Sequence, residues 1–411
     1  MKILWVKHGK LLPVDAGGKI RTYNILRYLA SRHHVELLAP YSGQQDLSYE
    51  KELAELFPGS IAICTNAPED SDSALTQWSH YLTRTLSRAP YAVEKFTSRA
   101  VRKLVTEKLD GRQFDVAVCD FLAVSHNFPV VLKTPTVLFQ HNVESIIWQR
   151  QARWEKNTIK RIVFKMEAAK MNRYEANALR RFQYIIAVSE SDRNLMSKEV
   201  APQKITVVPT GVDLTQFKAA NDSEPAGHQV IFLGSMDWEA NVDAVSHFCQ
   251  EIWPLVLSEV PDAKFRIVGR NPSPSVKRLA SQSVEVTGTV PSVTEYLQAA
   301  SVVVVPLRIG GGTRLKIFEA MATGKAVVST TIGAEGLEVQ DGKDIFLVDS
   351  PEAFAKRVVD VLRNSALRGR IGKAAAVTAS KHDWSCVAPL FEKVLSEVAD
   401  SPSKTKSFGV S

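Results

Sequence analysis

The sequence predicts an α/β protein built from two doubly wound domains. Short apolar runs of four or five residues alternate with helical patterns, which is typical of parallel sheets covered by helices. The alternation restarts near residue 230, after a polar stretch rich in Ala, Asp, Ser and Pro. A chain of 411 residues is long enough for two cores, so we expect two sheets rather than one oversized sheet.

The first half contains six apolar runs that predict strands, at residues 3–6, 35–39, 116–119, 136–140, 184–188 and 205–208. The first run is followed by a loop at residues 8–18 that ends in Gly17-Gly18, and then by a helix at residues 19–30. Glycines between a first strand and its helix let a substrate approach the backbone, but they serve plain tight turns as well. Residues 44–112 are expected to be mostly helical or irregular.

The second half predicts five strands, at residues 230–233, 265–268, 284–287, 302–305 and 326–329, with a helix at residues 241–257. Gly234 opens the loop after the first of these strands. Gly288-Thr289-Val290 follows the third and offers backbone groups to a nucleotide base, with a simple turn as the alternative. The domain boundary is expected near Pro209, and a ligand pocket between the domains would be lined by strand ends from both.

The most informative segment begins after residues 302–305. Gly310, Gly311, Gly312 and Thr313 form a loop, and a helical segment then carries Arg314, Lys316 and Glu319. Parallel sheets bind ligands at the carboxyl ends of their strands, and glycines beside a helix N-terminus suit an anion. Arg314 and Lys316 can face one ligand only if Arg314 lies in the loop and Lys316 in the first helical turn. We expect a diphosphate at the cations and hydroxyl groups at Glu319; a surface ion pair is the alternative.

His141 follows the predicted strand at residues 136–140, where such sheets present functional groups. A histidine there can donate a hydrogen bond to a substrate hydroxyl or stabilise developing charge. The alternative is a structural histidine at a strand-to-helix turn.

Composition is that of a soluble globular protein, with 45% hydrophobic and 23% charged residues. Lys2 is followed by only four apolar residues, so no signal peptide is expected, and no apolar run approaches the roughly 20 residues of a membrane span. The four cysteines form no CxxC pair, which favours a cytosolic protein over a disulfide framework or a zinc site.

The net charge of +7 is unevenly distributed. Cations crowd residues 150–181, interleaved with Trp148, Trp154, Phe164 and aliphatic side chains. One interpretation is a basic helix that lies on an anionic membrane surface, with the three aromatic residues sharing a broad stripe. The other is a solvated helix with an ordinary core-facing stripe. Nucleic acid is disfavoured because no nucleic-acid-binding module accompanies the charge.

Taken together, these segments resemble a retaining glycosyltransferase of family 4, with two Rossmann-like domains facing a cleft (the GT-B fold). The resemblance runs from residue 1 to about Trp384, and its motifs are specific as an ordered set. The matching segments are Gly17-Gly18, Gln140-His141-Asn142, residues 184–189, residues 208–213, Gly234 with Asp237, Trp238 and Asn241, Gly288, and residues 310–324.

The chain departs from the family pattern near the donor. The family has two glutamates with seven residues between them; the second matches Glu319, but the first position is Gly311. The family's Arg and Lys after the first strand of the second domain are absent from residues 234–241, so Arg314 and Lys316 are expected to replace them. The variant looks like a branch found in exopolysaccharide clusters.

The resemblance implies that His141 lies beside the donor sugar and that Glu319 binds the ribose. It also implies an acceptor-side domain at residues 1–209 that includes a C-terminal helix at about 384–398, a donor domain at residues 210–383, and a tail at residues 399–411, which is expected to be disordered. No metal and no cofactor are expected, and the leaving phosphate would help to deprotonate the acceptor.

The sequence therefore predicts a glycosyltransferase that uses a nucleoside-diphosphate sugar. The rivals are a nucleotide-sugar epimerase of the same fold and a catalytically silent nucleotide-sugar-binding protein. The acceptor is expected to be lipid-linked or near a membrane, because residues 146–182 follow His141 directly. The protein is expected in the cytoplasm, with peripheral association at the inner face of the membrane.

Overall fold

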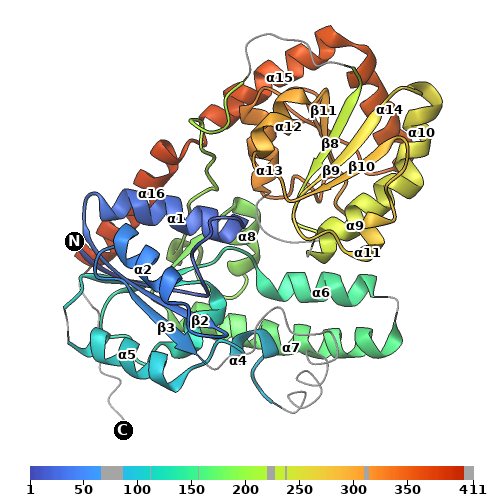
Figure 1. Cartoon of the computed structure of the whole chain (residues 1–411). Coiled ribbons are helices and arrows are strands. Elements are labelled where there is room, and N and C mark those ends of the chain that lie inside the picture. The colour runs from blue at the N-terminus through green and yellow to red at the C-terminus, as the bar shows by residue number, and fades with distance from the viewer. Residues whose placement is uncertain are drawn as a thin grey trace. The chain divides into compact units, whose positions relative to one another are not determined.

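The protein divides into two compact α/β units, which are described separately (Figure 1). The structure, a computed structural model, describes residues 1–65, 87–111, 113–155, 157–219, 227–236, 238–309 and 314–401. Unit 1 comprises Met1–Pro209 and Val387–Ser411, and unit 2 comprises Thr210–Cys386.

Unit 1 contains a parallel sheet of seven strands among its described residues, in the order β3-β2-β1-β4-β5-β6-β7. The strands are β1 (Lys2–Lys7), β2 (His34–Ser42), β3 (Ile61–Thr65), β4 (Val116–Asp120), β5 (Thr136–Phe139), β6 (Tyr184–Ala187) and β7 (Ile205–Val207). The order reverses between β1 and β4, which creates a crevice at their carboxyl ends where doubly wound sheets bind ligands.

Helices cover the strands of unit 1, whose apolar side chains alternate between the two faces. Leu4 and Val6 of β1 belong to the core under α5 and α7. Trp5 points to the opposite face, where it packs against Phe391 of α16. The helical segments are α1 (Gly17–Ala30), α2 (Leu47–Leu56), α4 (Tyr91–Glu94), α5 (Arg99–Asp110), η1 (Leu122–Asn127), α6 (Glu144–Trp154), α7 (Thr158–Arg181), α8 (Glu190–Met196), η2 (Pro202–Lys204) and α16 (Trp384–Asp400).

Unit 2 contains a second parallel sheet, with six strands among the residues described, in the order β10-β9-β8-β11-β12-β13. The strands are β8 (Gln229–Leu233), β9 (Lys264–Val268), β10 (Val284–Gly288), β11 (Val302–Val305), β12 (Val327–Ser329) and β13 (Phe346–Leu347). The order reverses between β8 and β11, so a second crevice lies where these two strands end.

The helices of unit 2 complete a single core in which the strands β8, β11 and β12 are buried on both faces. They are α9 (Glu239–His247), the π-helical segment η3 (Phe248–Ile252), α10 (Trp253–Glu259), α11 (Pro274–Lys277), α12 (Val293–Ala299), α13 (Leu315–Ala322), α14 (Pro351–Arg363) and α15 (Ser365–Ser380). Among the described residues, no helix combines the length and the apolar character that crossing a bilayer requires.

The predicted α/β class with two doubly wound sheets is confirmed, and several local predictions are wrong. β3 and β13 were not predicted. The helix predicted at residues 241–257 is interrupted by a π-helical turn, because Pro254 has no N–H to donate to the helix ladder. Gly17 and Gly18 form the first turn of α1 rather than the end of a loop. The basic segment at residues 150–181 is a hairpin of two helices rather than one helix.

Candidate active site

The crevice of unit 2 places Arg314 and Lys316 in the arrangement that a shared ligand requires. Arg314 precedes α13 with a non-helical backbone (φ −92°, ψ 81°), and Lys316 lies in the first helical turn. Arg314 is buried, whereas Lys316 and Glu319 are partly buried. Gly310, Gly311, Gly312 and Thr313, which the sequence assigns to the donor, lie outside the described residues.

Lys316 reaches from α13 to the end of β8. Its Nζ donates a hydrogen bond to Asn241 Oδ1 (2.8 Å) and lies 4.3 Å from the centre of the Phe232 ring. Asn241 Nδ2 in turn donates to the Ser235 carbonyl (2.8 Å). A Cβ atom at Gly234 would lie 2.8 Å from both Lys316 Nζ and Asn241 Nδ2. The glycine therefore permits the lysine to cross the switch point of the sheet.

Burial weakens the charges at this crevice. Burial, with a further effect of Arg314, lowers the pKa of Lys316 to about 7. Burial raises the pKa of Glu319 to about 7, against the opposing effect of Lys316. A cation that burial destabilises gains charge when an anion arrives beside it, so the pair is suited to bind a diphosphate near neutral pH.

Glycines at neighbouring strand ends bring the backbone of this edge close together. A Cβ atom at Gly269, directly after β9, would lie 1.8 Å from the Gly234 carbonyl oxygen, so only glycine fits there. Gly288 ends β10 with φ +72°, and Val290 beyond it packs partly buried against the unit 2 core. Gly269 was not predicted; a glycine directly after an apolar strand is the signal that could have found it.

The crevice of unit 1 holds a buried polar cluster around Asp120, the last residue of β4. Asp120 Oδ2 accepts hydrogen bonds from Trp5 Nε1 (3.0 Å) and Thr22 Oγ1 (2.7 Å). Its Oδ1 lies 2.6 Å from His141 Nε2. Lys7, the last residue of β1, pairs with Asp120 in the strand register, and burial lowers the pKa of Lys7 to about 8.

His141 lies directly after the carboxyl end of β5 with both ring nitrogens engaged. Its Nδ1 lies 2.8 Å from Arg21 NH1. A guanidinium only donates, so Nδ1 accepts and the ring proton sits on Nε2, from which it is donated to Asp120. Burial lowers the pKa of His141 to about 4, although Asp120 opposes this shift, so the ring is neutral. The predicted hydrogen bond from this ring to a substrate stays a prediction, and forming it requires one of these contacts to break.

Phe121 joins His141 to the glycines of α1. Its ring stacks on His141 with centroids 3.7 Å apart and planes 9° apart. Its φ of +81° is rare for a residue with a side chain, and such backbone strain clusters at functional sites. A Cβ atom at Gly18 would lie 2.6 Å from Phe121 Cζ. Gly18 is therefore required by side-chain packing, and the predicted approach of a substrate to the backbone of Gly17 and Gly18 stays a prediction.

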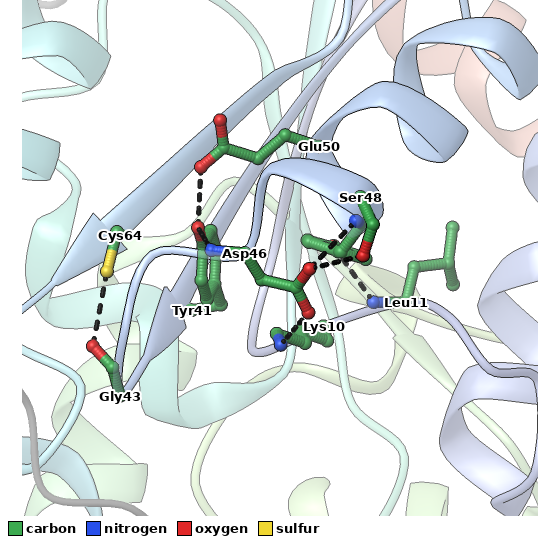
Figure 2. Close-up of polar contacts among 9 residues, drawn as sticks. Lys10, Leu11, Tyr41, Gly43, Asp46, Ser48, Glu50 and Cys64 are labelled. Carbon is green, nitrogen blue, oxygen red and sulfur yellow. Dashed lines mark hydrogen bonds and ion pairs between the residues drawn. The ribbon is translucent and has the colours of Figure 1, made fainter.

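The loop that leads into Gly17 is held against the neighbouring strand and helix (Figure 2). Lys10 Nζ lies 2.8 Å from Asp46 Oδ2 and over the rings of Tyr41 and Tyr49. The Leu11 N–H donates to the Tyr49 hydroxyl (3.2 Å). These contacts fix the start of the loop that carries the chain from β1 to α1.

Two family models match the chain. The model for Glycosyltransferase Family 4 matches residues 16–216, and the model for group 1 glycosyl transferases matches residues 227–364. The solved structure of Anabaena Alr3699/HepE in complex with UDP and glucose has the same fold, with a TM-score of 0.64 at 16% identity. The superposition covers 96% of this chain and 99% of that chain. The chain is a GT-B glycosyltransferase.

Two sequence relatives of this GT-B glycosyltransferase differ in how much they cover. A protein from the cps region of Klebsiella pneumoniae is 24% identical over 390 residues, which cover 88% of this chain and 91% of the relative. The phosphatidyl-myo-inositol mannosyltransferase of Mycobacterium tuberculosis is 30% identical over 236 residues. That match covers 54% of this chain and 61% of the mannosyltransferase, which is less than two thirds of its length.

Proposed function

We propose that this GT-B glycosyltransferase moves a sugar from a nucleoside diphosphate to an acceptor with retention of anomeric configuration. The observation that carries the proposal is the meeting of Lys316 with Asn241 and Gly234 at the switch point of unit 2. The HepE structure, which holds UDP and glucose, supports a nucleotide-sugar donor. The mannosyltransferase relative supports transfer over donor isomerisation.

In this proposal Arg314, Lys316 and the N-terminus of α13 stabilise the leaving diphosphate, with the backbone of residues 310–313 beside the phosphates. Glu319 binds the ribose hydroxyls, Gly234 and Val290 line the donor site, and no metal is required. The bond from the anomeric carbon to the phosphate oxygen breaks, and the bond to the acceptor oxygen forms on the same face. The acceptor proton passes to the leaving phosphate.

On the side of unit 1, His141 lies beside the donor sugar and Gly17-Gly18 contact substrate. The neutral His141 ring, held between Asp120 and Arg21, fixes the carboxyl end of β5. The acceptor belongs to glycoconjugate synthesis of the exopolysaccharide type and is lipid-linked or membrane-proximal. The cps-region relative and the basic segment at residues 146–182 support this acceptor class. The enzyme acts in the cytoplasm at the inner face of the membrane.

The test is incubation of the protein with a panel of nucleotide sugars, with and without lipid extracts. Transfer, or slow hydrolysis that releases the α-anomer from an α-linked donor, is the expected result. An isomerised donor would establish an epimerase, and binding without turnover would establish a silent binding protein. Lys316→Met should lower turnover on the order of 10²-fold, while Lys373→Met, at an exposed position of α15, should leave turnover unchanged.

A further inference from the structure

α6 and α7 form a hairpin whose base is tied together by buried contacts (Figure 1). Glu175 of α7 accepts hydrogen bonds from the hydroxyl of Ser145 (2.6 Å) and from the N–H groups of Glu144 (2.8 Å) and Ser145 (3.1 Å), at the start of α6. Further along, Trp148 and Phe164 meet edge to face with centroids 5.9 Å apart. The hairpin is therefore a braced element of unit 1.

The bracing corrects the expectation that three aromatic residues share one membrane-facing stripe. That expectation treated the segment as one helix, but α6 ends at Trp154 and a separate helix, α7, begins at Thr158. Trp148 and Phe164 consequently pack against each other inside the hairpin. Of the three aromatic residues, Trp154 is the exposed one, at 46%.

A cavity of about 630 Å³ is lined by residues of both helices. Three cations line it, Arg153 from α6 and Arg161 and Lys165 from α7, together with the amides of Gln149 and Asn172. Alanines from both helices complete the lining and leave room for a ligand. Among the described residues, no carboxylate lines the cavity, so its chemistry is that of a site for a phosphate group.

Large apolar side chains stand exposed at the end of the hairpin, next to these cations. The exposed fractions are 46% for Trp154, 71% for Ile159, 54% for Ile162 and 43% for Met166. Ile159, Ile162 and Met166 follow each other at helical spacing on α7, so they form one stripe. An apolar stripe bordered by cations matches the boundary between the acyl chains and the phosphate headgroups of a bilayer.

We propose that the α6–α7 hairpin docks on anionic membrane lipids, with a lipid phosphate in the cavity and the stripe in the acyl boundary. The inference rests on the proposed function, to which it adds the residues and the headgroup chemistry. The stripe decides the source of the phosphate: a soluble phosphate compound would use the three cations but would leave Ile159 and Ile162 in water. Charge attraction brings the hairpin to the surface, and the cavity selects the headgroup.

The test is co-sedimentation of the full chain with vesicles of phosphatidylglycerol and phosphatidylcholine, compared with phosphatidylcholine alone. Binding is expected only to the anionic vesicles and should weaken as salt rises. Arg161→Gln with Lys165→Gln should weaken binding about 10-fold or more, as expected from the loss of two surface cations. Arg161→Lys with Lys165→Arg keeps the charge and should bind like the wild type.

The matched control is Arg173→Gln with Lys198→Gln, which removes the same charge from exposed positions of unit 1 outside the cavity. Equal weakening by both double variants would overturn the cavity and leave only diffuse attraction. Ile159→Ser with Ile162→Ser should also weaken binding; unchanged binding would overturn the role of the stripe. If millimolar inorganic phosphate displaced the protein from the anionic vesicles, the cavity would be assigned to a soluble phosphate instead.

Donor turnover without vesicles separates this inference from the proposed function. Every hairpin variant should hydrolyse the donor at the wild-type rate, because none of the changed residues is among those assigned to the donor or to the chemical step. Turnover without vesicle binding would refute the docking inference and leave the transferase proposal standing. Vesicle binding without turnover of any donor would do the reverse.

Discussion

At the start of α13, Lys316 occupies a position that only a glycine at residue 234 permits. Its ammonium group contacts Asn241 and the Phe232 ring in place of water. This burial lowers the pKa of Lys316 to about 7. A lysine in this state gains most from a bound diphosphate, because the ligand restores the charge that burial opposes.

Replacement of either cation should therefore slow the chemical step. Arg314→Met and Lys316→Met should each lower kcat on the order of 10²-fold, the scale for losing one preorganised contact to developing charge. Glu319→Gln should mainly raise KM for the donor. Steady-state kinetics with a soluble acceptor, or donor hydrolysis, measures both effects. Near-wild-type kcat in both cation variants would refute the diphosphate assignment.

Gly234→Ala tests the same contact from the other side. The new methyl group would meet Lys316 Nζ and Asn241 Nδ2 at 2.8 Å, which displaces the lysine. We expect turnover to fall with a modest stability loss of about 1–3 kcal/mol, the usual cost of overpacking. Gly369→Ala is the control: nothing lies within 4 Å of its added Cβ atom, and it lies within α15. That change should stabilise the protein slightly and leave turnover intact.

Because the His141 ring is neutral in the fold, we predict that the protein becomes less stable as the pH falls. Burial lowers the pKa of His141 from its ordinary value of 6.5 to about 4 in the fold, so the unfolded chain binds the proton first as pH falls. Stability contributed by the neutral ring is therefore present above about pH 6.5 and is lost between about 6.5 and 4. The loss is on the order of 3 kcal/mol. Urea unfolding across this range should show a steep slope that His141→Gln reduces; an equal slope in both proteins would contradict it.

The cluster around Asp120 also shows which site residues could be predicted from the sequence and which could not. His141, Arg314 and Lys316 were visible in the sequence because each stands beside a strand or a glycine loop. Lys7 and Asp120 carry the same signal, a charge at the end of an apolar strand, but their pairing depends on strand order. Arg21 reaches His141 across 120 positions of sequence, which no local pattern reveals.

Among the elements, α16 has an unusual part in the fold because its residues from Val387 on belong to unit 1. Phe391 is fully buried against Trp5 and Phe139, with ring centroids 5.4 and 4.9 Å away. Glu392 accepts a hydrogen bond from the Tyr28 hydroxyl (2.8 Å), so the helix also contacts α1. α16 thus closes one face of the first sheet.

Phe391→Ala should accordingly destabilise unit 1 by about 3–5 kcal/mol, the usual cost of deleting a buried phenylalanine. Leu390→Ala changes the adjacent residue, which is 45% exposed, and should cost less than about 0.5 kcal/mol. Thermal unfolding followed by circular dichroism distinguishes the two variants. Similar melting temperatures would mean that the helix contributes little to unit 1.

Sequence patterns predicted most central strands because buried parallel strands are apolar at nearly every position. They missed β3 and β13, which lie at the edges of their sheets. β3 is an apolar run but lies within residues 44–112, which were expected to be helical or irregular, and β13 has only two residues. The break between α6 and α7 was also missed, although Asn157 is a regular N-cap that accepts from the N–H groups of Ile159 and Lys160. The break was not recognised because the sequence is rich in cations both before and after it.

At the scale of the whole molecule, unit 2 is inserted between the two pieces of unit 1. The segments at its two ends lie side by side: the Val212 N–H donates to the His382 carbonyl (2.7 Å), and the Trp384 N–H donates to the Val212 carbonyl (3.2 Å). Trp384 also packs on Gly211, where a Cβ atom would lie 2.6 Å from the indole ring. The restart of the βα pattern predicted two units, whereas the return of the last helix to the first unit was implied by the family resemblance and not by composition.

A chain that ends after Cys386 should lose the closing face of unit 1 while it keeps all of unit 2. We expect such a protein to bind a hydrophobic dye and to aggregate, because Trp5 and Phe139 would be uncovered. Dye fluorescence and light scattering measure this outcome against the full chain. A truncated protein that stays monomeric and dye-free would show that the helix is dispensable.

The same insertion sets an order of events on the ribosome. The first 209 residues emerge well before the last helix, and domains fold from the N-terminus as they are synthesised. Throughout the synthesis of unit 2, the first sheet of the growing chain therefore lacks α16, and Trp5 and Phe139 stay uncovered. When translation has reached the end of α15, unit 2 is complete but unit 1 still lacks its last helix. Chaperones are suited to bind such a nascent state.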